Sequence, residues 1–465
     1  MSRSAANSRR KSPQPFAPAS SHGEPSHAAK ATPLYHKILY PANGAPASPP
    51  RILHSSSHAR LDPLILDLIA LSLRAFIAPW YNAAISRDPD KHFLQAVTTV
   101  LIRVIQALEV RLASIDWTQL VLEDLPSLLE NHYRDWDLAC EKAQDLSTHN
   151  FSRDEMFHRL QPHIAISLSE STGSPQVDPV YLRALVDHLL KILLPPEDHR
   201  AETERAIVRE VLVGVVFGSV FGKVAQPWFL HGVIARVLEA REVIQSLDSK
   251  GPSTSSNLPF PTLFDQAVSA LGRTSALLSA GIAFATNLVV IGQSTPHADP
   301  SRAPFHSHLF SLALAVLPRS ATVAQLSQYL SLPLDFASHS IDSFLARFIS
   351  TSIATEQTAR TVLEGATRGM FPNDGWPAPK DPDPDEQGRK ELEERCEAAV
   401  AHLIPDKLAS LFYAQATRTD SAQLRFAAHL LRPFSSHVAN VHLFVHVLDL
   451  LVGRLFPELV DNPEE

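Results

Sequence analysis

The residues with the clearest capacity for chemistry are histidines near the C-terminus. His442 and His446 are four residues apart, so an expected helix would place them on one face, with His437 just upstream. Two histidines at this spacing can bind zinc. The chain has 22 histidines, however, and neither an HExxH motif nor a cysteine cluster accompanies this pair. We interpret them as surface or groove-lining side chains, and we expect no metal and no cofactor.

Other patterns also stop short of a catalytic site. The acidic run 381–386 contains Pro382 and Pro384 and lacks the glycine of an EF-hand loop, which favours a solvated loop over a calcium site. The sequence has no GxSxG motif, and no reactive-cysteine signature surrounds Cys140 or Cys396. We therefore expect a protein that is not an enzyme and has no catalytic residue.

A glycine stripe interrupts one apolar segment. Gly214, Gly218 and Gly222 recur at every fourth position in VLVGVVFGSVFG, a pattern that packs helices closely in membranes. The same spacing lets two helices of a water-soluble body approach each other. The apolar stretch is only about a dozen residues, well short of a bilayer span. Close packing inside the protein is the favoured interpretation.

The charge distribution sets a basic tail against an acidic body. Residues 1–60 carry a net charge of +7 and the remaining residues −15. Such a tail suits an anionic surface, phospholipid or nucleic acid, but its basic residues are dispersed, which equally fits a solvated tail without a partner. Two distant cysteines fit a reducing compartment, and the N-terminus shows no apolar secretory segment. We expect a cytoplasmic protein.

Helical spacing dominates the rest of the chain. Apolar residues recur at intervals of three and four from Leu61 onward, and no strict alternation exceeds five residues. We therefore expect an all-α fold without a sheet, built as an elongated multi-helix bundle. The expected organisation is a disordered Ser/Pro-rich tail at 1–59 with a docking island at 34–40, helical regions at 60–247, 262–364 and 365–460, a linker at 248–261, and an acidic tail at 461–465.

One uncharged segment, 276–291, raises the question of membrane insertion. It holds about 16 residues, including Ser279, Gly281, Thr286 and Asn287, whereas a spanning helix needs about 20 mostly apolar ones. A buried helix is favoured, and integral insertion through 276–291 remains the less favoured alternative.

The stretch Leu61–Glu239 resembles a PXA domain, a helical module found in some sorting nexins. The resemblance rests on LDPLILDLIALSLRAFIAPWYNAAISRDPDKHFLQAV, DWTQLVLEDLPSLLENHYRDW, LQPHIAI and the helix ETERAIVREVLVGVVFGSVFGKVAQPWFL. The C-terminal part is similar to a sorting-nexin C-terminal (nexin-C) domain through GMFPNDGW, IPDKL and LDLLVGRLFPEL, although the glycine expected shortly after IPxxL is missing. Residues 240–365 are too helical and apolar for a PX domain. The chain therefore resembles fungal-type PXA proteins that lack PX and RGS domains.

The resemblance implies that the PXA and nexin-C-like domains pack together and hold an apolar groove for acyl chains. It implies a non-enzymatic, membrane-associated protein of endosomal or endoplasmic reticulum trafficking or lipid transfer, peripheral on those membranes. Phospholipid or a membrane surface is the expected partner, with possible protein partners in trafficking and no nucleic acid. The alternative is a protein-binding scaffold without lipid cargo. The residues expected to line the groove are Val211, Val215, Gly218, Phe221, Ile282, Leu288, Phe444, Leu448 and Leu451.

Overall fold

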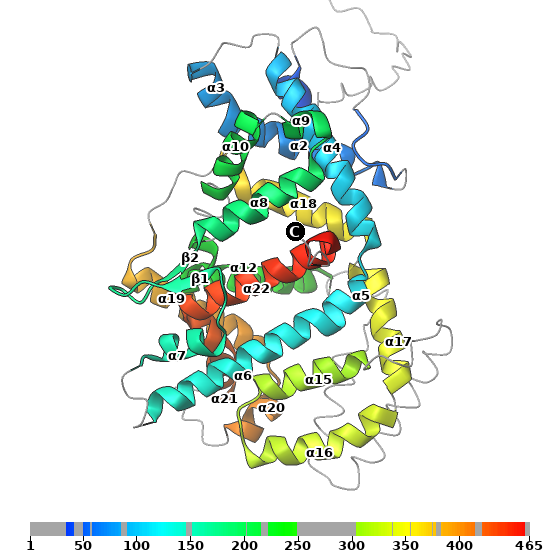
Figure 1. The fold of residues 1–465 in the computed structure, drawn as a ribbon. Coiled ribbons are helices and arrows are strands. Elements are labelled where there is room, and N and C mark those ends of the chain that lie inside the picture. The colour runs from blue at the N-terminus through cyan, green and yellow to red at the C-terminus, as the bar shows by residue number, and fades with distance from the viewer. Residues whose placement is uncertain are drawn as a thin grey trace, which may run out of the picture.

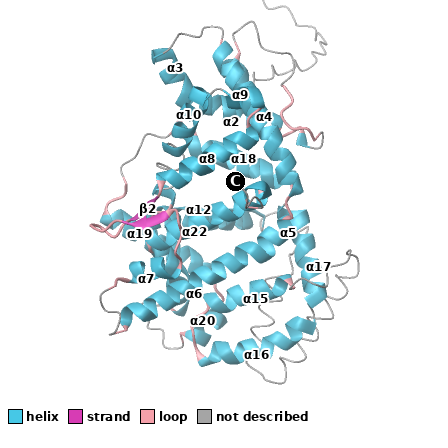
Figure 2. Cartoon of the chain, viewed as in Figure 1, coloured by secondary structure: helices cyan, strands magenta, loops and turns pink. Residues whose placement is uncertain are grey.

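Helices make up nearly all of the regular structure of the chain (Figure 2). The structure, a computed structural model, describes residues 34–40, 50–55, 58–84, 91–145, 151–200, 202–214, 222–248, 304–336, 338–353, 355–373, 375–377, 383–413 and 421–460. The all-α fold predicted from the helical spacing of apolar residues is confirmed. The expected linker 248–261, apart from Asp248, and the segment 276–291 lie outside the described residues.

The N-terminal helices form one end of the elongated body (Figure 1). They are α1 (Leu34–Leu39), α2 (Asp62–Ser72), a π-helical turn (Leu73–Ile77), α3 (Ala78–Ala84) and the long α4 (His92–Ser114). A proline inside a helix usually ends it, but here the helix continues through Pro79 to Ala84. The π-helical turn just before Pro79 changes the hydrogen-bond register, so the missing N–H of the proline does not stop the helix.

The following region supplies the middle of the body. Its helices are α5 (Trp117–Gln119), continued by a π-helical turn (Leu120–Asp124) into α6 (Leu125–Gln144), then α7 (Arg153–Leu160), α8 (Pro179–Leu193), α9 (Pro196–Arg200), α10 (Glu202–Val211), α11 (Gly222–Val224) and α12 (Pro227–Asp248). Helix α7 begins at a capping box, in which the Ser152 hydroxyl accepts from the Glu155 N–H and the Glu155 carboxylate accepts from the Ser152 N–H.

A small hairpin contradicts the expectation of no sheet. Strands β1 (Ile166–Leu168) and β2 (Pro175–Val177) pair antiparallel, with Ile166 opposite Val177. Each strand has three residues, too few for an alternating pattern to be visible in the sequence. The turn between them contains Gly173 at a φ of +64°, a left-handed conformation that glycine adopts without steric cost.

The C-terminal half adds the remaining helices. They are α15 (Phe305–Val316), α16 (Ala321–Phe336), α17 (Ser338–Phe348) with a π-helical turn (Ile349–Ile353), α18 (Glu356–Met370), α19 (Glu386–Leu403), α20 (Asp406–Phe412), α21 (Ala422–Leu431), a 3-10 turn (Arg432–Ser435), α22 (His437–Leu455) and a last 3-10 turn (Pro457–Leu459).

The two halves of the chain interlock. Helix α19 lies along α12, where Arg395 Nε donates to Glu239 Oε1 at 2.6 Å. Helix α15 packs against α6, and the Tyr133 hydroxyl of α6 donates to the Leu430 carbonyl of α21 at 2.8 Å. Helix α22 crosses α6 and α7 in the middle of the body (Figure 1). Elements far apart in sequence therefore share one core.

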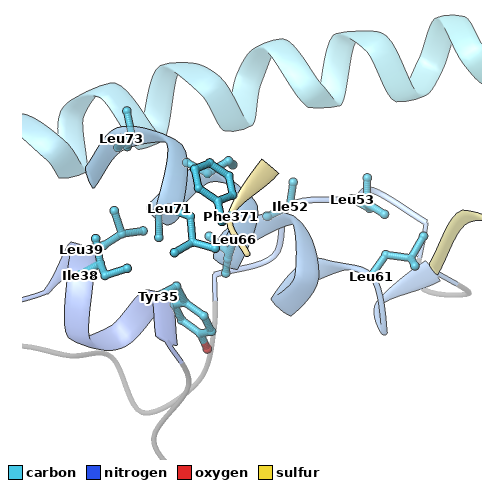
Figure 3. Close-up of a cluster of buried hydrophobic side chains, with 12 residues drawn as sticks. Tyr35, Ile38, Leu39, Ile52, Leu53, Leu61, Leu66, Leu71, Leu73 and Phe371 are labelled. Atoms are coloured by element: carbon cyan, nitrogen blue, oxygen red, sulfur yellow. The ribbon is translucent and has the colours of Figure 1, made fainter. Parts of the chain in front are cut away.

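A hydrophobic cluster at the N-terminal end draws on both halves (Figure 3). Its buried members are Tyr35, Ile38, Leu39, Ile52, Leu53, Leu61, Leu66, Ile69, Ala70, Leu71, Leu73 and Phe371. Helix α1, which forms the island 34–40, docks here, and the Tyr35 N–H donates to Asp67 Oδ1 at 2.8 Å. Phe371 enters the same cluster from the C-terminal half, so the two ends of the fold are joined at this point as well.

Candidate functional site

The first half of helix α22 lies largely inside the protein. It is buried at Val438, Ala439, Asn440, Val441, His442, Leu443 and Val445. The N-cap Ser436 accepts from the Ala439 N–H at 3.2 Å and donates to Asp154 Oδ1 of α7 at 2.9 Å. The Asn440 amide donates to the carbonyls of Ala225 at 3.0 Å and Phe434 at 2.9 Å. These bonds fix the rotation of the helix about its own axis.

The second half of α22 is apolar but only half-buried. Every residue from 446 to 455 has intermediate exposure, although most are aliphatic. Phe444, Leu448 and Leu451 follow one another at spacings of four and three, so they form one row along the helix. At about 3.6 residues per turn, this row lies roughly across the helix from His442, His446 and Asp449. The helix thus carries an incompletely covered apolar row opposite a polar face.

Helix α4 is even less covered. Two described helices, α4 and α22, are long and apolar enough to cross a bilayer by length and composition, a test that core helices also pass. In the most apolar stretch of α4, 6 % of the residues are buried, against 39 % for α22. Leu94, Val97, Leu101 and Ile105 pack against the N-terminal cluster. Val100, Val104 and Leu108 stand at spacings of four on a neighbouring face and remain half-buried.

Arg111 ties the end of α4 to the end of α22. Its guanidinium donates to the Leu455 carbonyl at 3.0 Å and pairs with Glu458 at 2.7 Å. It also lies over the ring of Phe456, 4.7 Å from the centroid. The hydrogen bond from Arg111 holds the pKa of Glu458 below its ordinary value. A second arginine, Arg454 of α22, pairs with Asp124 at 2.6 Å.

The polar face of α22 carries a cluster of histidines, which we call the histidine seam: His132, His158, His163, His442 and His446. His158 Nδ1 and His442 Nε2 are 3.0 Å apart. His163 Nδ1 accepts the Ala165 N–H at 3.0 Å, so its Nε2 carries the proton and donates to Asp449 Oδ2 at 2.7 Å.

Several groups of the seam are held in their neutral forms. Burial lowers the pKa of His132 to about 4 and that of His442 to about 3, with neighbouring histidines adding to the effect. Burial also lowers the pKa values of His158 and His446. Desolvation and the hydrogen bond to Asp449 raise the pKa of the Tyr181 hydroxyl.

The structure corrects the interpretation of His442. The sequence suggests surface or groove-lining histidines, yet His442 is 0 % exposed and belongs to the core. The error follows from composition, because a histidine whose neighbours on the helix are apolar gives no sign of the polar partner that another helix supplies. Within the described ranges, no three His, Cys, Asp or Glu side chains are arranged to hold a metal ion.

Three of the predicted groove residues can be placed. Phe444, Leu448 and Leu451 share the half-buried row of α22, and Phe444 packs at the edge of a buried cluster with Val441 and Val445. Val215, Gly218, Phe221, Ile282 and Leu288 lie outside the described residues, and for Val211 only the backbone, in α10, is described. The predicted grouping of the three segments thus stays a prediction.

Asp449, His163 and Arg111 were not predicted from the sequence. A signal existed for Asp449, because His442, His446 and Asp449 follow the spacing i, i+4, i+7 in an otherwise apolar helix. Neither His163 nor Arg111 has a comparable signal, since the partners of these residues lie nearly three hundred or more positions away along the chain.

Comparisons with known proteins address the N-terminal part. The model of the PXA domain family matches residues 58–237. PXA domain protein 1 of Schizosaccharomyces pombe is 30 % identical over 162 residues, which cover 35 % of this chain and 31 % of that protein. Sorting nexin-13 of Mus musculus is 23 % identical over 177 residues, which cover 37 % of this chain and 18 % of that protein.

These matches span less than a third of each relative, and no solved structure matches. The family match at residues 58–237 runs from α2 into α12, the same region in which the sequence motifs resemble the family. The chain therefore contains a PXA domain at residues 58–237.

Proposed function

We propose that this chain is a non-enzymatic, membrane-associated protein related to the sorting nexins, which binds lipid acyl chains along the half-buried apolar row of α22. The observation that carries the proposal is the row itself, Phe444, Leu448 and Leu451, on a helix that runs through the middle of the body. A helix in such a position normally buries its apolar side chains against its neighbours. An acyl chain would complete that burial.

The energetics favour such an occupant. Each methylene removed from water contributes about 0.8 kcal/mol, so about ten methylenes would contribute about 8 kcal/mol before ordering costs. From Phe444 to Leu455 the helix rises about 16 Å, at about 1.5 Å per residue. Helix α4 approaches α22 at Arg111, which donates to the Leu455 carbonyl near the end of this row.

Peripheral attachment agrees with the polar contacts of both long helices. Spanning a bilayer would require α22 to give up the partners of Asp449 and Arg454. It would require α4 to give up those of Arg111 and of Glu109, whose carboxylate accepts the His54 N–H at 2.7 Å. Placing these charged groups in the hydrocarbon of a bilayer without their partners would cost several kcal/mol of free energy, by the order of magnitude of such transfers. The similarity to sorting nexin-13 supports placing the function in membrane trafficking. Endosomal or endoplasmic reticulum membranes are the proposed location.

Native mass spectrometry of the purified full chain tests the proposal. We expect co-purified phospholipid, or uptake from phosphatidylcholine vesicles. Replacing Leu448 and Leu451 by Gln removes two half-buried contacts worth about 1–1.5 kcal/mol each, which lowers affinity for lipid about 30- to 150-fold. Val110→Gln is the matched control, because Val110 is apolar, 63 % exposed and on another face of α4.

The outcomes separate the competing functions. Absence of lipid before and after incubation with vesicles refutes acyl-chain binding and leaves a protein-binding scaffold. Equal lipid occupancy in the double variant and the Val110 control moves the lipid site away from α22. Stoichiometric metal bound at His442 and His446 in elemental analysis would instead support an enzyme.

A further inference from the structure

The histidine seam joins two parts of the chain that are distant in sequence. His132 lies on α6, His158 on α7 and His163 in the following loop, all within the PXA domain. His442 and His446 lie on α22, more than 200 residues beyond the end of that domain. The rings are close: the centroids of His158 and His442 are 5.2 Å apart, those of His163 and His446 5.3 Å, and those of His442 and His446 6.3 Å.

The seam has few anions to compensate positive charge. Asp135 of α6 accepts from the Gln161 amide at 2.9 Å. Asp449 of α22 is bonded to His163 at 2.7 Å and to the Tyr181 hydroxyl of α8. Among the described residues, the negative charges of both carboxylates raise the pKa of His446. The neighbours whose charges shift the pKa of His442 are all histidines, and they lower it.

The other charged groups around α22 lie at its two ends. Asp154 of α7 faces the N-terminal end at Ser436 and raises the pKa of His437, which burial lowers. The positive charge of Arg159 of α7 lowers the pKa of His158, in addition to the effect of burial. At the C-terminal end, Arg111 of α4 pairs with Glu458, and Asp124 pairs with Arg454. These groups leave the middle of the helix, at His442, without a carboxylate partner in the described structure.

The most deeply buried members of the seam also lack hydrogen bonds that protonation would require. Both ring nitrogens of His132 and Nδ1 of His442 are buried without a partner in the described structure. His132 is 1 % exposed and packs edge-on against Phe157, as His442 does. A charged imidazolium at either position would need two acceptors in surroundings made largely of aromatic and aliphatic groups.

We propose that protonation of His132 and His442 in mildly acidic solution loosens α22 from α6 and α7, so that the histidine seam acts as an acid-sensitive contact between the PXA domain and the C-terminal helix. The proposal depends on the seam alone and holds whether or not an acyl chain binds to the opposite face of α22.

The direction follows from linkage. Both histidines have pKa values below about 6.5 when the seam is closed, so the open state binds more protons. The closed seam is therefore fully favoured above about pH 6.5 and loses this advantage as the pH falls. Between about pH 7.5 and about pH 5, each histidine shifts the equilibrium about 30-fold toward the open state, and the two together on the order of 1,000-fold.

Hydrogen exchange measured by mass spectrometry on the full chain tests this inference, with rates converted to protection factors to remove the intrinsic pH dependence. At about pH 5 we expect α22 and the facing residues of α6 and α7 to lose protection, while α2 in the N-terminal cluster keeps it. Replacing both His132 and His442 by Gln, which cannot be protonated, should abolish the loss. His188→Gln is the matched control, because His188 is exposed on α8.

Each outcome bears on the proposal. Unchanged protection of α22 in the wild-type chain at about pH 5 overturns it, and so does a simultaneous loss in α2, which would be general acid unfolding. A double variant that keeps the full acid response also overturns it. If the double variant does not fold at neutral pH, the wild-type profile alone decides, through the difference between α22 and α2.

Discussion

Replacing Gly375 by Ala probes the junction between the two halves of the chain. Gly375 has a φ of +80°, and its carbonyl accepts from the guanidinium of Arg74, in the π-helical turn that follows α2. Arg74 also stacks over Trp376, with its guanidinium carbon 4.4 Å from the ring centroid. A Cβ added at Gly375 would stand 2.7 Å from Arg74 Nη2 and 2.7 Å from Leu71 Cδ2. Leu71 is 2 % exposed, so it has little room to move.

The expected cost is the sum of separate physical effects. A left-handed conformation costs a residue with a Cβ about 1–2 kcal/mol. Displacing the buried Leu71 adds about 1–3 kcal/mol, and weakening the Arg74 hydrogen bond adds about 1 kcal/mol. We therefore expect Gly375→Ala to lower the free energy of unfolding by about 3–6 kcal/mol, measured by urea denaturation followed through tryptophan fluorescence.

Gly365→Ala provides the matched control. Gly365 lies inside α18, and a Cβ there meets nothing within 4 Å, so alanine should raise stability by up to about 1 kcal/mol. If Gly375→Ala were as stable as the wild-type chain, the 371–376 segment would not pack on α2 as described. The interlocking of the two halves at this end would then be wrong.

Four further outcomes follow from the structure and the charge distribution. Arg111→Ala should lower the melting temperature near neutral pH, and the difference from wild type should shrink as acid protonates Glu458, because a carboxylate with a lowered pKa stabilises only above that pKa. Cys396 should resist maleimide in the folded chain, because burial raises the pKa of its thiol to about 11; rapid labelling would contradict its burial. Binding to acidic liposomes should weaken as salt rises and when residues 1–33 are deleted, and unchanged binding would assign the basic tail another role. Proteolytic cleavage near 248–260 should leave the halves associated through α12 and α19 in size-exclusion chromatography; separation into two monomers would contradict the interlocked core.

The sequence by itself determined the class of the fold and the position of most helices. The spacing of apolar residues predicted helical regions at 60–247, 262–364 and 365–460, and the observed α8, α21 and α22 lie inside them. Helical periodicity is a local property, so it can be read from a single segment. The motifs between Leu61 and Leu230 likewise identified the PXA domain, since they lie within the matched residues 58–237.

Local departures from these patterns were not predictable in the same way. The helix passes Pro79 because a π-helical turn precedes it, and hairpin β1–β2 is too short to show an alternating pattern. The π-helical turn and the hairpin each depend on which backbone hydrogen bonds form in the folded protein. Helix propensity and proline positions alone do not specify that choice.

Only the tertiary structure decided which polar groups meet. His163 and Asp449, Arg111 and Leu455, and Arg74 and Gly375 are each joined across more than 280 residues of sequence. His442 was taken for a surface or groove residue because burial depends on which helices cross over it, and no segment of one helix records the identity of its neighbours. The half-buried row of α22 has the same origin. The spacing of its residues can be read from the sequence, but their exposure is set by the packing of α22 against α4, α6 and α7 and by the bond from Asn440 to the Ala225 carbonyl.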